Sequence, residues 1–415
     1  MTEQSEGIGK RSSWKWSLAV AWVAQFLCLV GFDAFFPFIP FYVRDLGVTD
    51  PDHVKIWSGI IMSTTAAAMT LVSPLWGLLA DRKGTKLMVL RAAFGGAVTL
   101  VAMALAQNVQ QFFVLRVVQG ALTGFNLAFV MLVSSFVPSS RIGSALGMMQ
   151  MGAYLAFSAG PLLGGVLADY VGYRLTCVFA AGALLLGGLL VVFLLPDSTT
   201  QRSAGTGNLR AGLRAITQSS AVGRVLVIVG AIYLANSLSR PVLPLFVESL
   251  MSDLAKVNTG TGALYGAMSF ASAISAVWIG RLGDRVGYQR IVLVCAAGVA
   301  LAYGAQALSP SFTWLVIATL VTGFFIGGLL PTTNAIIART APKEVQGTVY
   351  GLSNSISSVG RMFGPAMGAG VAAAWGMRYT FALAGFVFGM VAFWLFRDER
   401  FRPESRSDSN GEVMK

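Results

Sequence analysis

Apolar runs of about 20 residues alternate along the chain with short breaks rich in charged and turn-forming residues. A helix of about 20 apolar residues crosses roughly 30 Å of hydrocarbon, so each run is long enough to span a membrane. We therefore predict twelve transmembrane helices, at residues 16–43, 57–79, 87–106, 111–137, 145–168, 176–195, 222–247, 263–282, 291–308, 314–338, 348–373 and 380–396.

The composition agrees with this pattern. Hydrophobic residues make up 55% of the 415 residues, charged residues 12%, and the mean hydropathy is +0.69. A soluble protein of this size would need far more polar surface. The expected fold class is an all-α integral membrane protein with twelve transmembrane helices.

Basic residues are distributed unequally between the two sets of loops. Most of the thirty Lys and Arg lie in the termini, the even-to-odd loops and the middle linker, whereas the opposite loops hold only Arg44, Lys55, Arg174, Lys256 and Arg378. Cytoplasmic loops collect basic residues, so both termini are predicted to be cytoplasmic. The net charge of +12 is then explained by topology and contact with anionic lipid, and we expect no nucleic-acid partner.

Prolines and glycines recur at an offset of 203 or 204 residues. Pro37 and Pro40 return as Pro241 and Pro244, and Gly160-Pro161 returns as Gly364-Pro365. Parallel repeats of this size indicate two similar six-helix bundles. The domain prediction is a cytoplasmic N-terminal segment at 1–15, bundles at 16–195 and 222–396, a cytoplasmic linker at 196–221, and a cytoplasmic tail at 397–415.

The loop after the second predicted helix carries the strongest motif. It reads Gly77-Leu-Leu-Ala-Asp81-Arg82-Lys-Gly84-Thr-Lys86, and it returns as Gly280-Arg-Leu-Gly-Asp284-Arg285-Val-Gly287. A glycine at the position of Gly77 permits close helix approach, and one at the position of Gly84 permits a sharp turn. We interpret the charged cluster as a conformational latch, with a polar topogenic loop as the alternative. A full charge relay would need an acid at the inner end of the fourth predicted helix, where the nearest charge is instead Arg141.

These residues resemble the major facilitator superfamily, and within it the twelve-helix drug:proton antiporters. The loop motif is similar to that family's first signature, and Leu115-Arg116-Val-Val-Gln119-Gly120-Ala-Leu-Thr-Gly124 is similar to the signature whose Arg is linked with proton coupling. Pro37-Phe-Ile-Pro40, Trp57-Ser-Gly59 and the Gln107-Asn108 turn look most like its multidrug-resistance protein G subgroup. The resemblance covers nearly the whole chain and implies two pseudo-symmetric bundles around a central cavity lined by helices 1, 4, 7 and 10.

The fifth predicted helix carries Gly160-Pro161-Leu-Leu-Gly164-Gly165, and the eleventh repeats it around Gly364-Pro365. Proline kinks a helix, and the glycines make a smooth face for tight packing. The resemblance associates this motif with antiporters, although packing alone explains both copies.

Four charged residues lie inside predicted helices: Asp33, Arg116, Arg240 and Arg361. A charge at mid-bilayer costs about 2.5–3.5 kcal/mol on insertion scales, so it marks a partner or a watered cavity. At 1.5 Å per residue, Asp33 and Arg116 are both expected roughly 10–15 Å below the outer surface. We hypothesise that they form a proton-coupling pair that is made and broken during transport, the alternative being a static structural pair. Arg116 has no copy, since Thr319 occupies its place in the second half.

Three Arg against one Asp leave the interior positive, which favours substrates with an acidic group. Amide side chains would add hydrogen bonds, and aromatic rings an adaptable apolar wall. Besides Arg240 and Arg361, the predicted substrate-binding residues are Gln119, Asn126, Asn236, Asn334, Asn354, Phe36 and Phe129.

The leading prediction is a proton-coupled multidrug exporter of the bacterial inner membrane that works by alternating access. The alternative is a dedicated exporter of one acidic metabolite, such as a siderophore. A channel is disfavoured by the two kinked halves, and an enzyme by the lack of clustered catalytic groups. We expect no cofactor beyond the proton gradient, because no phosphate-binding loop is present, and no metal, because Cys28, Cys177 and Cys295 lack metal-like spacing. The expected partners are a small-molecule substrate, protons and membrane lipids, and we expect a monomer.

Overall fold

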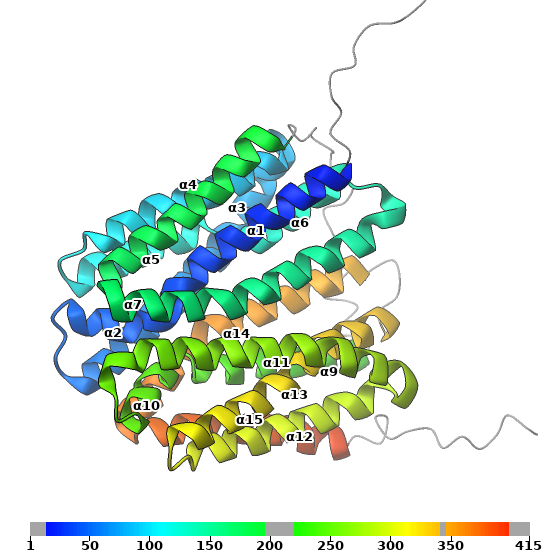
Figure 1. Ribbon diagram of the computed structural model, residues 1–415. Helices are drawn as coiled ribbons and strands as arrows, with labels where there is room; N and C mark the ends of the chain where they lie inside the picture. Colours follow the sequence, from blue (N-terminus) through cyan, green and yellow to red (C-terminus); the bar gives the residue numbers. More distant parts are fainter. Residues whose placement is uncertain (1–13, 196–219, 341–345, 398–415) are drawn as a thin grey trace, which may run out of the picture.

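The computed structural model describes residues 14–195, 220–340 and 346–397, and every regular element within these ranges is a helix (Figure 1). The first half contains α1 (Trp14–Phe35), η1 (Phe36–Phe38), α2 (Ile39–Asp45), α3 (Pro51–Lys83), α4 (Thr85–Ala104), α5 (Val109–Leu122), α6 (Phe125–Phe136), η2 (Ser139–Arg141) and α7 (Ile142–Leu194). The second contains α9 (Ser220–Leu238), α10 (Leu243–Leu250), η3 (Leu254–Lys256), α11 (Val257–Val286), α12 (Tyr288–Ala307), α13 (Phe312–Thr340), α14 (Gln346–Ala374) and α15 (Met377–Arg397).

The ends of these helices follow from local chemistry. Asp50 caps α3, because its carboxylate accepts the backbone N–H groups of Asp52 and His53 at 2.9 and 2.8 Å. The bond from His53 is the main reason why the pKa of Asp50 lies below its usual range. Gly84 ends α3 with a φ of +89°, and its repeat copy Gly287 ends α11 with a φ of +98°. Glycine adopts this left-handed region without the strain that a Cβ would add.

Every one of the twelve predicted ranges overlaps a described helix, but some boundaries differ. The fifth and sixth ranges both lie in α7, which is interrupted by a kink at the non-helical Gly172 (φ +78°), between the two predicted ranges. The first, fourth and seventh ranges are each divided, and α9 and α10 meet at an angle of 41°. Within the described ranges, nine helices are long and apolar enough to cross a membrane, and the α9–α10 pair makes a tenth. One of the nine is the 53-residue α7, whose length suffices for two crossings.

Each half has its own hydrophobic core. One cluster is built mainly from residues between Leu18 and Leu195, and the other from residues between Val225 and Leu395. Between the halves, α7 packs on α11 and α3 packs on α14. These four helices carry the seams at which the two bundles meet.

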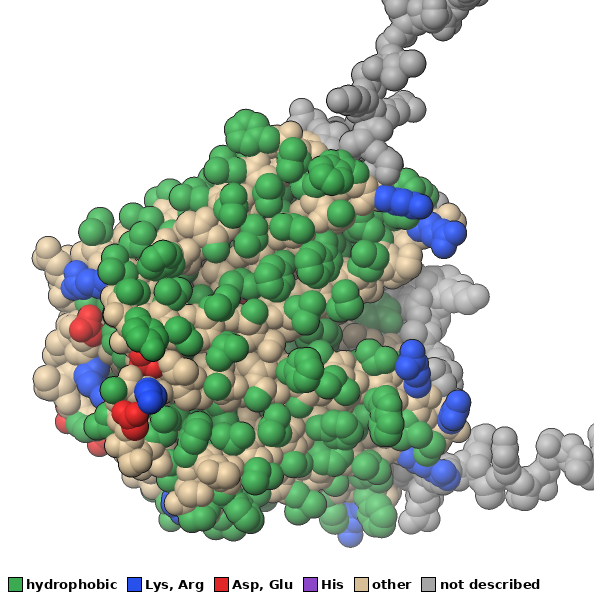
Figure 2. All heavy atoms as spheres, in the orientation of Figure 1, with side chains coloured by type: hydrophobic (Ala, Val, Ile, Leu, Met, Phe, Trp, Pro, Cys, Tyr) green, Lys and Arg blue, Asp and Glu red, His purple; other side chains and the backbone are tan. Residues whose placement is uncertain are grey.

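The molecule has two ends that differ in charge. We call the end that holds Trp14 and Arg397 the terminal face, and the end that holds Asp45 and Leu250 the distal face (Figure 1). Figure 2 shows basic side chains along the terminal face, with mixed acidic and basic side chains at the distal face. Between them Figure 2 shows a surface covered mainly by apolar side chains. An apolar belt between two charged rims is the expected surface of a multi-pass membrane protein.

Candidate functional site: the interior between the halves

Charged residues meet between the two halves, away from both faces. Asp33 lies near the end of α1, Arg116 on α5, Arg240 in the turn between α9 and α10, and Arg361 on α14. Asp33, Arg240 and Arg361 keep part of their surface accessible although none lies at a face. Figure 2 shows a recess between the two halves on the terminal side. We call the space lined by these side chains the central site.

Asp33 is a carboxylate without a hydrogen-bond partner on Oδ2, which is buried. Gly160 of α7 lies against it, so that a Cβ at position 160 would come within 3.1 Å of the Asp33 Cβ. A buried carboxylate oxygen without a partner is costly, which makes Asp33 a candidate for binding a proton or a ligand.

Arg116 is almost fully buried, with 1% of its surface exposed. Its Nη1 donates to Gln119 Oε1 at 2.6 Å, whereas Nε and Nη2 have no partner. The predicted pair is therefore not made in this conformation: among the described ion pairs none joins Asp33 to Arg116, because Arg116 is held on its own helix by Gln119. Gln119, predicted to bind substrate, is buried and instead orients this guanidinium.

Phe36 lies between two guanidinium groups. Its ring centroid is 5.6 Å from Arg116 Cζ and 5.8 Å from Arg240 Cζ. Arg240 is also anchored through its backbone, because the Tyr265 hydroxyl donates to its carbonyl oxygen at 3.2 Å. A cation about 6 Å or less from an aromatic centroid is attracted to the ring face. Phe36 thus joins a cation of the first half to a cation of the second.

Arg361 lies further along the second half. Its Nη2 donates to Ser358 Oγ at 3.2 Å, and its Cζ lies 5.0 Å from the Tyr233 ring centroid. Tyr233 was not among the predicted residues. The sequence feature that could have identified it is its position on α9, which is the repeat counterpart of the helix that carries Asp33.

The predicted amides have different environments. Asn126 Oδ1 accepts from Gln25 at 3.3 Å, and Asn236 Oδ1 accepts from the Tyr303 hydroxyl at 3.4 Å. Asn334 and Asn354 are exposed. The structure thus connects Asn126 and Asn236 to Gln25 and Tyr303, two residues that the sequence did not single out.

Phe129 is in a different place from the one predicted. Its side chain is fully buried in the core of the first half. An aromatic residue at helical spacing packs in a core as readily as it lines a cavity, and only the helix rotation decides between the two.

The loop motif is described in part. Lys86 Nζ donates to the carbonyl oxygens of Val192 and Leu195, at 3.2 and 2.7 Å, near the end of α7. Arg82 and Arg285 are exposed. The side chains of Asp81 and Asp284 lie outside the described part of the structure.

The close helix approach predicted at Gly77 is absent, since a Cβ there would meet no atom within 4 Å. In the same motif, only the turn at Gly84 is visible in the backbone.

The glycines of α7 and α14 contact neighbouring backbones. A Cβ on Gly164 would overlap the carbonyl of Ala34 on α1, and one on Gly364 would meet Leu234 and Ser237 on α9. Gly165 faces the carbonyl of Asn258 in the other half. The carbonyl oxygens of Pro161 and Pro365 are in turn approached by Gly262 and Gly59. These residues pack helices together both within and between the halves.

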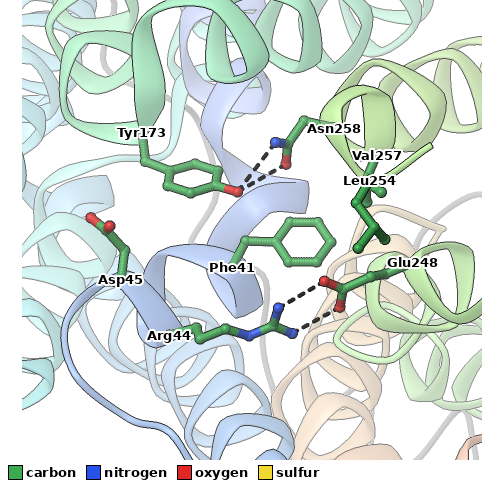
Figure 3. A pocket seen from close by; sticks show the side chains of 8 residues that line it. All are labelled: Phe41, Arg44, Asp45, Tyr173, Glu248, Leu254, Val257 and Asn258. Atoms are coloured by element: carbon green, nitrogen blue, oxygen red, sulfur yellow. Dashed lines mark hydrogen bonds and ion pairs between the residues drawn. The ribbon is translucent and has the colours of Figure 1, made fainter.

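Polar contacts join the halves at the distal face. Arg44 on α2 forms two hydrogen bonds with Glu248 on α10, at 2.7 and 2.8 Å (Figure 3). The Tyr173 hydroxyl lies 3.2 Å from Asn258 Nδ2. These residues line a cavity of about 250 Å³ with Phe41, Asp45, Leu254 and Val257.

A carboxylate of the first half caps a helix of the second. Asp169 Oδ1 accepts from Asn258 Nδ2 at 2.8 Å and from its backbone N–H at 3.3 Å, and Oδ2 accepts from the Thr259 backbone N–H at 2.7 Å. These are N–H groups at the start of α11, where no side chain of the flanking residues supplies a cap. The distal face is therefore closed by contacts that neither half could make alone.

Metal ions are bound by groups of ligating side chains that lie close together. Within 14–195, 220–340 and 346–397, no group of three His, Cys, Asp or Glu residues is placed to hold a metal ion. The chemistry of the central site is thus that of isolated charges, amides and aromatic rings.

Comparison with known proteins agrees with this architecture. The model of the Major Facilitator Superfamily matches residues 21–233 and 225–413. Multidrug resistance protein MdtG of Serratia proteamaculans is 33% identical over 379 residues, which cover 91% of this chain and 92% of that protein. The Salmonella typhimurium protein of the same name is 32% identical over 382 residues, covering 92% and 94%. Among solved structures, a bacterial homologue of the human lysosomal transporter Spinster, inward-facing and unoccupied, has a TM-score of 0.77 at 13% identity, with 95% and 98% coverage.

Proposed function

Because the chain belongs to the major facilitator superfamily and is a membrane transporter rather than an enzyme, we propose that it is a proton-coupled multidrug exporter. It works by alternating access in the bacterial inner membrane, with both termini in the cytoplasm. The distal face is then periplasmic, and the structure represents an inward-facing state. The small-molecule substrate, protons and membrane lipids are its partners, the monomer is the working unit, and no cofactor is required.

The main observation behind this proposal is the carboxylate of Asp33, whose buried Oδ2 has no hydrogen-bond partner. It lies between two halves that are closed on one side. Asp33 Oδ2 is buried without a hydrogen bond, so a proton or a cationic group would relieve its cost. The two halves contact each other through α7–α11 and α3–α14 near the distal face. A proton that changes the charge of Asp33 therefore acts where the halves meet, which is what coupling to a rocking motion needs.

The relatives support drug export as the transport reaction. Proteins named multidrug resistance protein MdtG are about one-third identical to this chain over more than nine-tenths of its length. The central site combines charged, amide and aromatic side chains, the kinds of group that contact ligands of different chemistry.

The test is transport by purified protein in liposomes with an imposed pH gradient. Three probes differ in charge: ethidium is cationic, chloramphenicol neutral and nalidixic acid acidic. We expect gradient-driven movement of more than one probe, and its loss in Asp33→Asn. Counterflow of labelled against unlabelled probe separates a carrier from a channel. Flux that needs no gradient and survives Asp33→Asn would contradict the proposal.

One observation favours a second function. Arg116, Arg240 and Arg361 outnumber Asp33 in the central site, and two nitrogen atoms of Arg116 have no partner. Unpaired guanidinium groups favour a carboxylate or similar acid. A dedicated exporter of one acidic metabolite, such as a siderophore, would move neither the cationic nor the neutral probe in the same experiment.

A further inference from the structure

Phe36 and Arg240 occupy corresponding positions of the two repeats but have diverged in sequence. Phe36 precedes Pro37 in the first half, and Arg240 precedes Pro241 in the second, 204 positions later. Arg44 and Glu248 show the same separation of 204 and pair directly across the halves. Counterpart positions after α1 and α9 therefore face each other across the pseudo-symmetry axis. The 5.8 Å contact between the Phe36 ring and the Arg240 guanidinium is another such cross-axis contact.

This divergence places a cation of the second half close to Asp33. Asp33 precedes Phe36 by three residues, about one helical turn. Its repeat counterpart is Ser237, so the second half has no matching acid. The ionisable side chains around this level are Arg116 on α5, Arg240 before α10, Tyr265 on α11, Tyr303 on α12 and Arg361 on α14.

The three arginines differ in the contacts that they make. The Arg240 guanidinium lies over the ring of Phe36, one helical turn from Asp33. Arg116 is buried and donates to Gln119 on its own helix. Arg361 is directed to Ser358 and the Tyr233 ring.

The locations of Arg116 and Arg240 decide which of them changes its distance from Asp33 when the two halves rock. Arg116 lies in the same half as Asp33, and two groups on one rigid body keep their separation when the halves move. Arg240 lies in the other half, so its distance from Asp33 changes with the angle between the halves. Only a pair that spans the halves converts a change in the charge of Asp33 into a preference for one conformation.

We propose that Arg240 is the positioning residue of the coupling step: it attracts charged Asp33 across the two halves, and protonation of Asp33 releases that attraction. This proposal rests on the proposed function, since it names the partner in proton coupling. The ring face of Phe36, one helical turn from Asp33, holds the guanidinium of Arg240. Arg116 adds positive charge to the interior, but its distance from Asp33 does not change because both lie in the same half.

The first test needs no transported substrate. Difference infrared spectroscopy of the full-length protein in lipid, titrated with acid, reports the protonated carboxyl of Asp33 as the band lost in Asp33→Asn. Arg240→Gln should change the pH midpoint of that band clearly, Arg240→Lys less, and Arg116→Gln less than either. A midpoint that moves with Arg116→Gln and not with Arg240→Gln would overturn the proposal.

The second test is a pair of double-mutant cycles on ethidium counterflow, which needs no pH gradient and can therefore be measured in Asp33→Asn. If Asp33 and Arg240 act together, Asp33→Asn combined with Arg240→Gln should be no slower than the worse single variant. For Asp33→Asn with Arg116→Gln, the fold-losses should multiply. Multiplying losses in the first cycle would contradict the pairing.

These outcomes separate the inference from the proposed function. If wild type transports no probe, the proposed function fails while the infrared midpoints still report the pair. If wild type transports ethidium but Arg240→Gln leaves both the midpoint and the pH-gradient dependence at wild-type values, only the inference fails. The conservative variant Arg240→Lys, which keeps a cation, shows whether losses in Arg240→Gln come from charge or from misfolding.

Discussion

The two seams between the halves are related by the repeat but are held together differently. In both, a glycine lies under a proline carbonyl of the partner: Gly262 under Pro161 in the α7–α11 seam, and Gly59 under Pro365 in the α3–α14 seam. Beyond this shared packing, the α7–α11 seam has Asp169, whose carboxylate accepts three N–H groups of the opposite half.

The position that corresponds to Asp169 in the α3–α14 seam is Ala373, and the start of α3 is capped within its own half by Asp50. Here the polar contacts are the bond from the Ala366 N–H to Ser63 Oγ at 2.9 Å and a longer one, at 3.4 Å, from Lys55 to the Ala372 carbonyl. Small residues thus provide the packing that both seams share. Only the α7–α11 seam also has the strong hydrogen bonds of Asp169, which we call the polar latch. We therefore expect the α3–α14 seam to open with less resistance.

The largest effect is expected where both seams are equal. Gly262→Leu and Gly59→Leu would each drive a side chain into the proline carbonyl of the other half. Overpacking costs about 1–3 kcal/mol, so the closed distal face should be disfavoured roughly 5- to 150-fold. The check is labelling of Val257→Cys, buried at this face, with a membrane-impermeant maleimide.

The matched control for these variants is Gly182→Leu on α7, since a Cβ at Gly182 meets nothing within 4 Å. The three native cysteines are buried, which keeps the labelling background low. Equal labelling of all three glycine variants would contradict the packing account.

A smaller effect, confined to one seam, is expected from the polar latch. Asp169→Ala leaves the start of α11 without its cap, and hydrogen bonds to a charged group are worth about 1.5–3 kcal/mol. Distal labelling should therefore rise roughly 10-fold or more. Asp169→Asn keeps one acceptor oxygen and should have an intermediate effect.

The comparison variant in the other seam is Lys55→Ala, which should change labelling less than Asp169→Ala does. If Lys55→Ala opened the distal face as readily, the two seams would be equally held and the proposed asymmetry would be wrong.

The ion pair between Arg44 and Glu248 should matter less again. Both side chains are partly exposed, at 46% and 27%, and exposed pairs are worth about 0.2–1 kcal/mol. Arg44→Glu should raise distal labelling a few-fold, less so in high salt because the pair is screened. Arg44→Glu with Glu248→Arg should restore wild-type labelling, and a double variant as open as the single one would exclude a direct pair.

The smallest effect is expected at Asp50, which caps α3 within its own half. Its pKa is lowered, so the stability that it adds is present above the ordinary carboxylate pKa of about 3.9 and is lost as the pH falls through its lowered value. Asp50→Ala should lower the melting temperature slightly at neutral pH, and this difference should shrink in strong acid. A difference that grew on acidification would contradict the capping role.

The sequence predicted the helices and the two halves because apolar run length and repeated Pro and Gly are local signals. Gly84 is an example: its place in the loop motif indicated a turn, and its φ of +89° is that turn. The break at Gly172 is a second example, because its non-helical φ of +78° lies between the predicted ranges 145–168 and 176–195.

The central site was predicted less well, because contacts across halves depend on tertiary geometry. Asp33 was singled out by the cost of a buried charge, but its neighbour in the other half could not be read from spacing along one helix. Asp169 was missed for the same reason: a carboxylate near a helix end resembles a solvated surface group until the start of α11 is placed beside it.

The central claim is that the halves rock, so that one face opens as the other closes. Two pairs of spin labels test it in the full-length protein in lipid: His53→Cys with Leu254→Cys at the distal face, and Lys83→Cys with Val286→Cys at the terminal face. All four positions are exposed. The distances within the two pairs, measured by double electron–electron resonance, should change in opposite directions when the pH is lowered. Asp33→Asn should abolish this response. Distances that change in the same direction, or that respond fully in Asp33→Asn, would contradict alternating access coupled to Asp33.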